Sequence, residues 1–210
     1  MKQHKIFLFF KRIVLFLFSV LKVVNMQKIT LKDKTFRPFI TYDKIAASID
    51  KVAEQINKDF EGCTDVPVLL CVLNGSIRFM AELMQRLDFN CQIISIKLTS
   101  YEGTETTGKV KQAMGLTADI TGRRVIVVED IVDSGRTLSY LLEMLQDRHP
   151  ASLHLCTLLD KPERRKAKVF ADYAGAQIPD AFVVGYGLDY DEKYRNLPFV
   201  GALKPAVYEK

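Results

Sequence analysis

Short apolar runs alternate along the chain with longer stretches in which apolar residues recur every three or four positions. The clearest run covers residues 66–73, and four more cover 93–98, 125–128, 153–159 and 182–184. An unbroken apolar run is typical of a strand that is covered on both faces. With 48% hydrophobic residues among 210, the chain can bury such a core, and global disorder is excluded.

The stretches between these runs carry the apolar stripes of amphipathic helices. The longest stripe has steps of three and four residues and consists of Ile45, Ile49, Val52, Ile56 and Phe60. Shorter stripes, which we also expect in the core, are Met80, Met84 and Leu87, then Leu138, Leu141, Leu142 and Leu145. This alternation predicts an α/β fold with a mostly parallel sheet between helices, and a ligand site at the carboxyl ends of the strands.

Residues 1–25 differ from the rest of the chain because they are apolar and basic and hold no acid. They carry five of the 30 basic residues, so residues 26–210 are formally neutral, with 25 residues of each sign. A signal peptide is disfavoured because no small-residue cleavage site follows. A membrane-spanning segment is also disfavoured, because the apolar stretch is short and Lys11 and Arg12 interrupt it. We expect residues 1–25 to be an extension outside the fold and residues 26–210 to form the working domain; an amphipathic surface anchor is the alternative.

Charge and composition argue against several classes of function. A neutral body gives no support for nucleic acid as a partner. The four cysteines show no C-x-x-C spacing, so a metal or disulfide framework is disfavoured, and we expect reduced, buried thiols in a cytoplasmic protein. The three histidines form no recognisable catalytic arrangement, which leaves little support for a Ser-His-Asp or Cys-His mechanism.

The most informative residues follow the third apolar run. Glu129 and Asp130 end the predicted strand, and Asp133 precedes a small turn that opens the next helix, made of Ser134, Gly135, Arg136 and Thr137. Unpaired amides at the start of a helix, together with the helix dipole, can hold a phosphate. The two acids would repel a phosphate, but they suit the hydroxyls of a ribose or a divalent metal. The sequence therefore predicts a sugar-phosphate site.

This string of four apolar residues, Glu-Asp, two apolar residues and Asp-Ser-Gly-Arg-Thr resembles the phosphoribosyl-diphosphate signature of the type I phosphoribosyltransferases. It has the spacing of neither a Walker loop nor a dinucleotide fingerprint. The resemblance extends over residues 26–204. It implies the fold of that family: a mostly parallel central sheet flanked by helices, with a small hood built from N- and C-terminal segments.

Two further segments resemble the hypoxanthine-guanine branch of that family. Leu73, Asn74 and Gly75 match its pyrophosphate loop, which carries a cis peptide at the position of the first two of these residues. Ser100 and Tyr101 match its catalytic lid, which keeps water from the activated sugar. Taken alone, these segments are more typical of a plain turn and of a loop without a role.

The C-terminal third resembles the purine-binding part of the same branch. The resemblance implies that Lys161 contacts O6 of the purine, that Phe182 stacks on the base and that the backbone of Val183 reads its edge. It also implies that Asp189 binds Mg²⁺ and that Arg195 holds pyrophosphate. Individually, a surface lysine, a core phenylalanine and a surface ion pair are the commoner interpretations, but the order along the chain favours the family roles.

The activity that the resemblance implies is purine salvage. The phosphoribosyl group of 5-phosphoribosyl 1-diphosphate (PRPP) would pass to N9 of hypoxanthine or guanine, giving IMP or GMP and pyrophosphate. Glu129, Asp130 and Asp189 would hold Mg²⁺, the turn 134–137 would bind the 5′-phosphate, and Asp133 would accept the N7 proton as general base. Family members assemble, so a cytoplasmic homodimer or homotetramer without stable membrane association is expected.

Three alternatives remain: a xanthine- or adenine-preferring relative, a nucleotide-sensing RNA regulator on the same fold, and an anchored membrane protein. Lys161 argues against adenine because an ammonium group favours an oxo over an amino group. The neutral body, with only the short basic run 164–166, argues against RNA. The membrane alternative rests on residues 1–25 alone, and the sequence does not rank hypoxanthine, guanine and xanthine.

Overall fold

Six strands form the central sheet, in the order β6-β5-β4-β7-β8-β9. They are β4 (Val68–Leu73), β5 (Gln92–Thr99), β6 (Lys111–Met114), β7 (Arg124–Val132), β8 (Ser152–Asp160) and β9 (Tyr173–Gln177). Five of them run parallel, and β6 pairs antiparallel with β5 at one edge. This computed structural model describes residues 29–31, 34–99, 111–114, 116 and 118–203.

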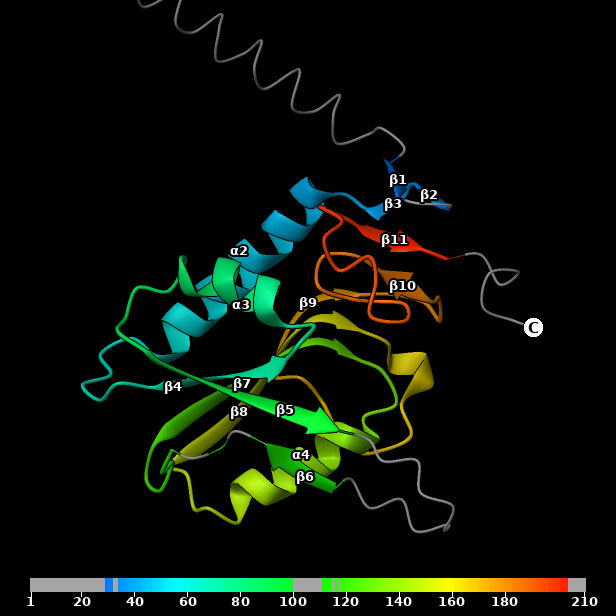
Figure 1. The fold of residues 1–210 in the computed structure, drawn as a ribbon. Helices are drawn as coiled ribbons and strands as arrows, with labels where there is room; N and C mark the ends of the chain where they lie inside the picture. Colours follow the sequence, from blue (N-terminus) through cyan, green and yellow to red (C-terminus); the bar gives the residue numbers. More distant parts are fainter. Residues whose placement is uncertain (1–28, 32–33, 100–110, 115, 117, 204–210) are drawn as a thin grey trace, which may run out of the picture.

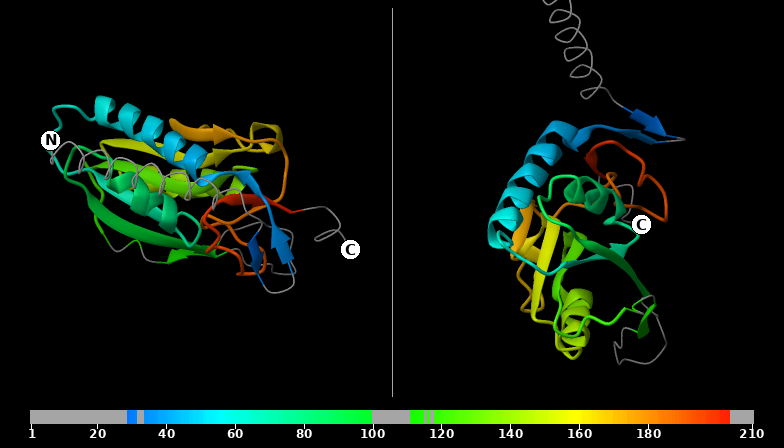
Figure 2. Two further views of the ribbon diagram at one scale, coloured as in Figure 1. Left: turned by 90° about the horizontal axis from the view of Figure 1, so that it is seen from above. Right: turned by 90° about the vertical axis from the view of Figure 1, so that its left-hand side faces the viewer.

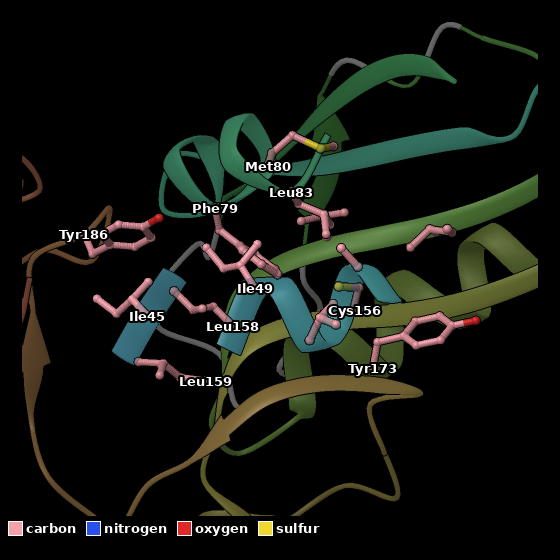
Figure 3. Close-up of a cluster of buried hydrophobic side chains, with 14 of the residues drawn as sticks. Ile45, Ile49, Phe79, Met80, Leu83, Cys156, Leu158, Leu159, Tyr173 and Tyr186 are labelled. Atoms are coloured by element: carbon pink, nitrogen blue, oxygen red, sulfur yellow. The ribbon is translucent and has the colours of Figure 1, made fainter. Parts of the chain in front are cut away.

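Helices cover both faces of the sheet, as the alternation predicts (Figure 1). The helices α2 (Tyr42–Asp59) and α3 (Ile77–Met84) lie on one face, and α4 (Arg136–Gln146) lies on the other. Figure 3 shows Ile45 and Ile49 of α2 beside Phe79 of α3 and Leu158 of β8. Each such buried side chain stabilises the fold by roughly 1.5–3 kcal/mol. On the opposite face, α4 contributes the buried residues Leu138, Leu141 and Leu145 to a second cluster.

A second, antiparallel sheet stands beside the edge to which the parallel strands point (Figures 1 and 2). It consists of β3 (Pro38–Ile40), β10 (Val183–Val184) and β11 (Val200–Ala202), in the order β10-β11-β3. The hairpin of β1 (Ile29–Leu31) and β2 (Lys34–Phe36) precedes it. We call this sheet and hairpin, with the connection from β10 to β11, the hood. It brings segments from both ends of the chain together, as expected.

Three features of the fold differ from the sequence-based expectation. Residues 182–184, predicted as a strand between two helix layers, contribute β10 to the hood, and β9 takes the outer place in the central sheet. The sequence of β9, Tyr-Ala-Gly-Ala-Gln, contains no apolar run, and a β-carbon on Gly175 would lie 2.7 Å from the carbonyl oxygen of Leu158 in β8. Met84 was expected in the core but is 39% exposed at the end of α3.

The four cysteines are free, but only Cys71 and Cys156 are buried, whereas Cys63 and Cys91 are half-buried. The expectation of four buried thiols is therefore wrong for two of them. No helix in the described part of the chain is long and apolar enough to cross a membrane. Residues 1–25 lie outside the described residues, so their proposed separation from the domain stays a prediction.

Candidate active site

The carboxyl end of β7 forms the floor of the site. After four fully buried valine and isoleucine side chains, Glu129 and Asp130 are only partly covered, and the chain then turns into α4. A pocket of about 300 Å³ opens here, and its lining includes Leu73, Glu129, Asp133, Ser134, Gly135 and Thr137. The two acids and the small-residue turn, which the sequence predicts to act on one ligand, therefore line the same pocket or border it.

The turn leaves amides free at the start of α4. Gly135 caps this helix with φ of 77°, a left-handed conformation that side chains other than glycine adopt only with strain. Its carbonyl oxygen accepts the first helical hydrogen bond, from the amide of Ser139 at 2.8 Å. The first amides of an α-helix have no intrahelical acceptor, so those of Arg136 and Thr137 are available to an anion. The Arg136 amide donates to the hydroxyl of Ser134 at 3.5 Å, the outer limit of a hydrogen bond, so an anion at this turn would replace that contact.

Glu129 and Asp130 form a carboxyl pair that resists full ionisation. Burial raises the pKa of Glu129 well above its ordinary value, and the neighbouring Asp130 charge raises it further. Burial also raises the pKa of Asp130, while a hydrogen bond from the amide of Ile131 at 2.7 Å and the charge of Arg195 act in the opposite direction. Hydroxyl donors or a cation brought to these oxygens would relieve the repulsion.

The raised pKa of Glu129 predicts a pH-dependent effect of Glu129→Gln on stability. A carboxyl group whose pKa is raised on folding lowers stability once the pH exceeds its unfolded pKa, and the loss grows until the pH passes the folded pKa. Glu129→Gln, with EDTA present, should therefore melt above the wild type at about pH 8, and this gain should shrink towards about pH 4.5. In thermal scans the melting temperature should rise by roughly 2–4 °C for each 1 kcal/mol that the buried, repelled charge of Glu129 costs the folded state. Glu54→Gln, which changes an exposed glutamate of α2, is the control; an equal gain at every pH would contradict the prediction.

The loop after β4 packs closely against Asp130 and against Gly187 of the hood. The peptide between Leu73 and Asn74 is cis, as the resemblance implies. A β-carbon on Gly75 would lie 1.5 Å from Oδ2 of Asp130, and a β-carbon on Gly187 would lie 2.0 Å from the carbonyl oxygen of Gly75. Only glycine fits at these two positions, so the loop, β7 and the hood can approach one another closely at the pocket.

Arg195 is held in the hood by three acceptors. Its guanidinium donates to the carbonyl oxygen of Gly187 at 2.9 Å and pairs with Asp189 and Glu192, each at 2.9 Å. The amide of Glu192 donates to Oδ2 of Asp189 at 2.9 Å. The arginine is thus fixed beside the loop at Gly75, where a positive charge can face an anion, and Asp189 is already engaged by this arginine.

Asp133 and Lys161 lie together at the ends of β7 and β8. The side chain of Lys161 is only 7% exposed, and its Nζ is 3.9 Å from Oδ2 of Asp133. Oδ1 of Asp133 lies 3.0 Å from Nε of Arg164, whose Nη1 is 3.3 Å from Asp180. A lysine excluded from water in this way is not the solvated surface charge that a lone lysine usually is.

Phe182 and Val183 stand on the hood and do not line the 300 Å³ pocket. Phe182 is 36% exposed and meets Tyr190 edge-on, with ring centroids 5.6 Å apart. Val183 is buried and pairs with Ala202 of β11. The sequence-predicted lid residues Ser100 and Tyr101 lie outside the described residues, between β5 and β6.

The family model of the phosphoribosyl transferase domain matches residues 41–191, which include the ends of β4, β7 and β8. The chain belongs to the phosphoribosyltransferase family. It is 43% identical over 179 residues to the hypoxanthine-guanine phosphoribosyltransferase of Streptococcus pneumoniae, covering 85% of this chain and 98% of that protein. It is 41% identical over 180 residues to the Bacillus subtilis protein of the same name, covering 85% and 99%.

Solved structures agree with this assignment. A hypoxanthine phosphoribosyltransferase from Staphylococcus aureus superposes with a TM-score of 0.74 and 42% sequence identity, covering 83% of this chain and 94% of that one. The type I phosphoribosyltransferase fold and the hypoxanthine-guanine branch, both expected from the motifs, are thereby confirmed.

Sequence reasoning missed several residues that shape this phosphoribosyltransferase site. Gly187 could have been suspected from the Gly-Tyr-Gly spacing before Asp189, but its contact with Gly75 joins two distant segments. Glu192 carries no role in the family motif, although it pairs with Arg195 at 2.9 Å. Arg164 and Arg165 were noted only as a short basic run, although each pairs with an aspartate beside the turn or strand end.

Proposed function

We propose that this chain transfers the phosphoribosyl group of PRPP to N9 of hypoxanthine or guanine, releasing pyrophosphate and giving IMP or GMP. The observation that carries the proposal is the pocket at the end of β7, which is lined by an anion-binding helix start and by Glu129, with its partner Asp130 next to it in the chain. Few ligands other than a sugar phosphate need both chemistries side by side. The names of the relatives reported above support the same substrates.

Each group of residues has one task in this reaction. The amides of Ser134 to Thr137 bind the 5′-phosphate, and the carboxyl groups of Glu129 and Asp130 accept hydrogen bonds from the ribose hydroxyls. Arg195 and the loop at Leu73–Gly75, fixed against Gly187, stabilise the charge that develops on departing pyrophosphate. These donors are positioned before the reaction, so little reorganisation is needed when the charge appears.

The purine lies against Lys161, Phe182 and Val183, with Asp133 beside it. Lys161, buried beside Asp133, donates to O6 and so favours an oxo over an amino group at that position. Phe182 stacks on the base, and the backbone of Val183 contacts its edge. Asp133 accepts the N7 proton as N9 forms the new bond to C1 of the ribose.

The carboxyl pair also suits Mg²⁺. Glu129 and Asp130 supply hard oxygen ligands whose mutual repulsion a divalent cation would relieve. Asp189 is the third candidate ligand, although Arg195 holds one of its oxygens. No cluster of three metal-ligating side chains is preformed among the described residues, which fits a cation carried mainly by substrate phosphates. Bound Mg²⁺ would neutralise charge on pyrophosphate as it leaves.

A spectrophotometric assay with PRPP, Mg²⁺ and one purine at a time tests this proposal. Hypoxanthine and guanine should each be converted to the nucleoside monophosphate, whereas adenine should not react at a comparable rate. Conversion of adenine as fast as hypoxanthine would refute the role of Lys161. Absence of turnover with every purine, from protein that melts cooperatively, would refute the proposed function itself.

We also propose a cytoplasmic homo-oligomer, a dimer or a tetramer. Four free thiols support a reducing compartment. Two large apolar side chains at the ends of α3 support assembly, because Ile77 is 52% and Met84 is 39% exposed. Light scattering after size-exclusion chromatography would decide between the dimer, the tetramer and a monomer.

A further inference from the structure

Arg165 packs against Gly135 in the turn that opens α4. Its guanidinium pairs with Asp160 at the end of β8, and both side chains are only 13% exposed. Asp160 is in register with Val132, just before the turn. Arg165 touches the turn but is not among the residues that line the 300 Å³ pocket.

The segment 165–169 also grips the turn through its backbone. The amides of Lys166 and Ala167 donate to the carbonyl oxygen of Ser134 at 2.9 and 3.1 Å. A β-carbon built on Gly135 would meet Cδ of Arg165 at 3.2 Å and Cβ of Val169 at 3.3 Å. The aliphatic part of the Arg165 side chain therefore packs directly against the left-handed Gly135. A change in that side chain would alter the position of the turn.

The pairing of Arg165 is incomplete. Its Nη1 is buried and has no hydrogen-bond partner among the described residues. A buried donor without an acceptor lowers stability, and a buried ion pair stabilises a fold weakly compared with apolar residues of similar volume. Folding alone would therefore favour an apolar pair at positions 160 and 165. The arrangement points to a task other than stability.

We propose that Arg165 is a positioning residue for PRPP: anchored on Asp160 and packed against Gly135, it holds the turn 134–137 in the conformation whose amides bind the 5′-phosphate. The inference rests on the proposed function. A displacement of the turn by a fraction of an ångström would misalign several amides at once, so the loss falls on phosphate binding. Phe182 is reached through the hood, and the ammonium group of Lys161, although it follows Asp160 in the chain, lies against Asp133, so the purine contacts should be affected less.

The decisive variant removes both charges together. Asp160→Leu with Arg165→Met replaces the pair by apolar side chains of similar shape, which avoids leaving an aspartate buried without its partner. We expect this double variant to melt at or above the wild-type temperature. Its KM for PRPP should rise roughly tenfold or more, while the KM for hypoxanthine at saturating PRPP changes less than about threefold.

A binding measurement and two single variants accompany the kinetics. Calorimetric titration of IMP, which carries the 5′-phosphate, should show an affinity roughly tenfold or more below the wild type. Arg165→Lys, as a single variant, keeps the positive charge and an aliphatic stem against Gly135, so its affinity for IMP should stay within about threefold of the wild type. Lys168→Met removes an equal charge from an exposed residue that makes none of these contacts with the turn, and it should leave both values unchanged.

The outcomes separate this inference from the proposed function. Wild-type protein that neither binds IMP nor uses PRPP would refute the function. If the wild type is active, a double variant with a wild-type KM for PRPP would overturn the role of Arg165, whatever its melting temperature. A parallel rise in both KM values, with a lower melting temperature, would also overturn it, because it would indicate general damage to the fold.

Discussion

Asp133→Asn is expected to lower kcat by roughly 10²- to 10⁴-fold, the usual contribution of a general base. An amide has the size and shape of the carboxyl group but cannot accept the N7 proton. The KM for PRPP should change only a few-fold, because the phosphate is bound by the backbone of the turn. Steady-state kinetics in which each substrate is varied would separate the two effects.

Asp180→Asn is the matched control for this variant. Arg164 lies 3.0 Å from Asp133 and 3.3 Å from Asp180, so either substitution removes one negative partner of the same arginine. Only Asp133 lines the pocket. We therefore expect kcat of Asp180→Asn to stay near the wild-type value. A kcat for Asp133→Asn close to the wild type, or equal losses in both variants, would refute the assignment of Asp133 as the base.

Gly187→Ala is expected to damage both stability and activity. The new β-carbon would lie 2.0 Å from the carbonyl oxygen of Gly75, and the residue has φ of 104°. Backbone strain and the clash together should lower the free energy of unfolding by roughly 2–4 kcal/mol. Because the clash displaces the pyrophosphate loop, kcat/KM for PRPP should fall by roughly 10²-fold.

Gly122→Ala separates the two causes. Gly122 also has a positive φ, 66°, but a β-carbon there would meet nothing within 4 Å. In this variant the free energy of unfolding should fall by about 1–2 kcal/mol from backbone strain alone, and the activity should be unchanged. Urea denaturation gives the free energies, and the assay with PRPP and hypoxanthine gives the rates. Equal losses of activity in the two variants would contradict the contact between Gly187 and the pyrophosphate loop as the cause.

The parts of the site that lie at strand ends could be predicted from the sequence, because each is a local pattern. Glu129 and Asp130 follow a buried run, and the turn to Thr137 opens a helix with a strong apolar stripe. The position of such residues in space follows from the rule that ligands bind at the carboxyl ends of parallel strands. Lys161 at the end of β8 follows the same rule.

The hood could not be derived in the same way. Its strands β3, β10 and β11 have two or three residues each, too few for a period to show. They pair only because segments from both ends of the chain meet, as in the pairing of Ile40 with Val200. The contact of Gly187 with Gly75 and the anchoring of Arg165 on Asp160 depend equally on tertiary structure. The hood and the roles of Phe182 and Val183 were inferred from resemblance, which substitutes for that missing information.

A crystal structure of the protein with IMP bound tests the central claim most directly. The account predicts that the 5′-phosphate lies on the amides of Ser134 to Thr137, that Glu129 and Asp130 face the two ribose hydroxyls, and that Lys161 contacts O6 of the base. A nucleotide whose phosphate lies away from this turn, with segment 165–169 closing over the free amides, would contradict it.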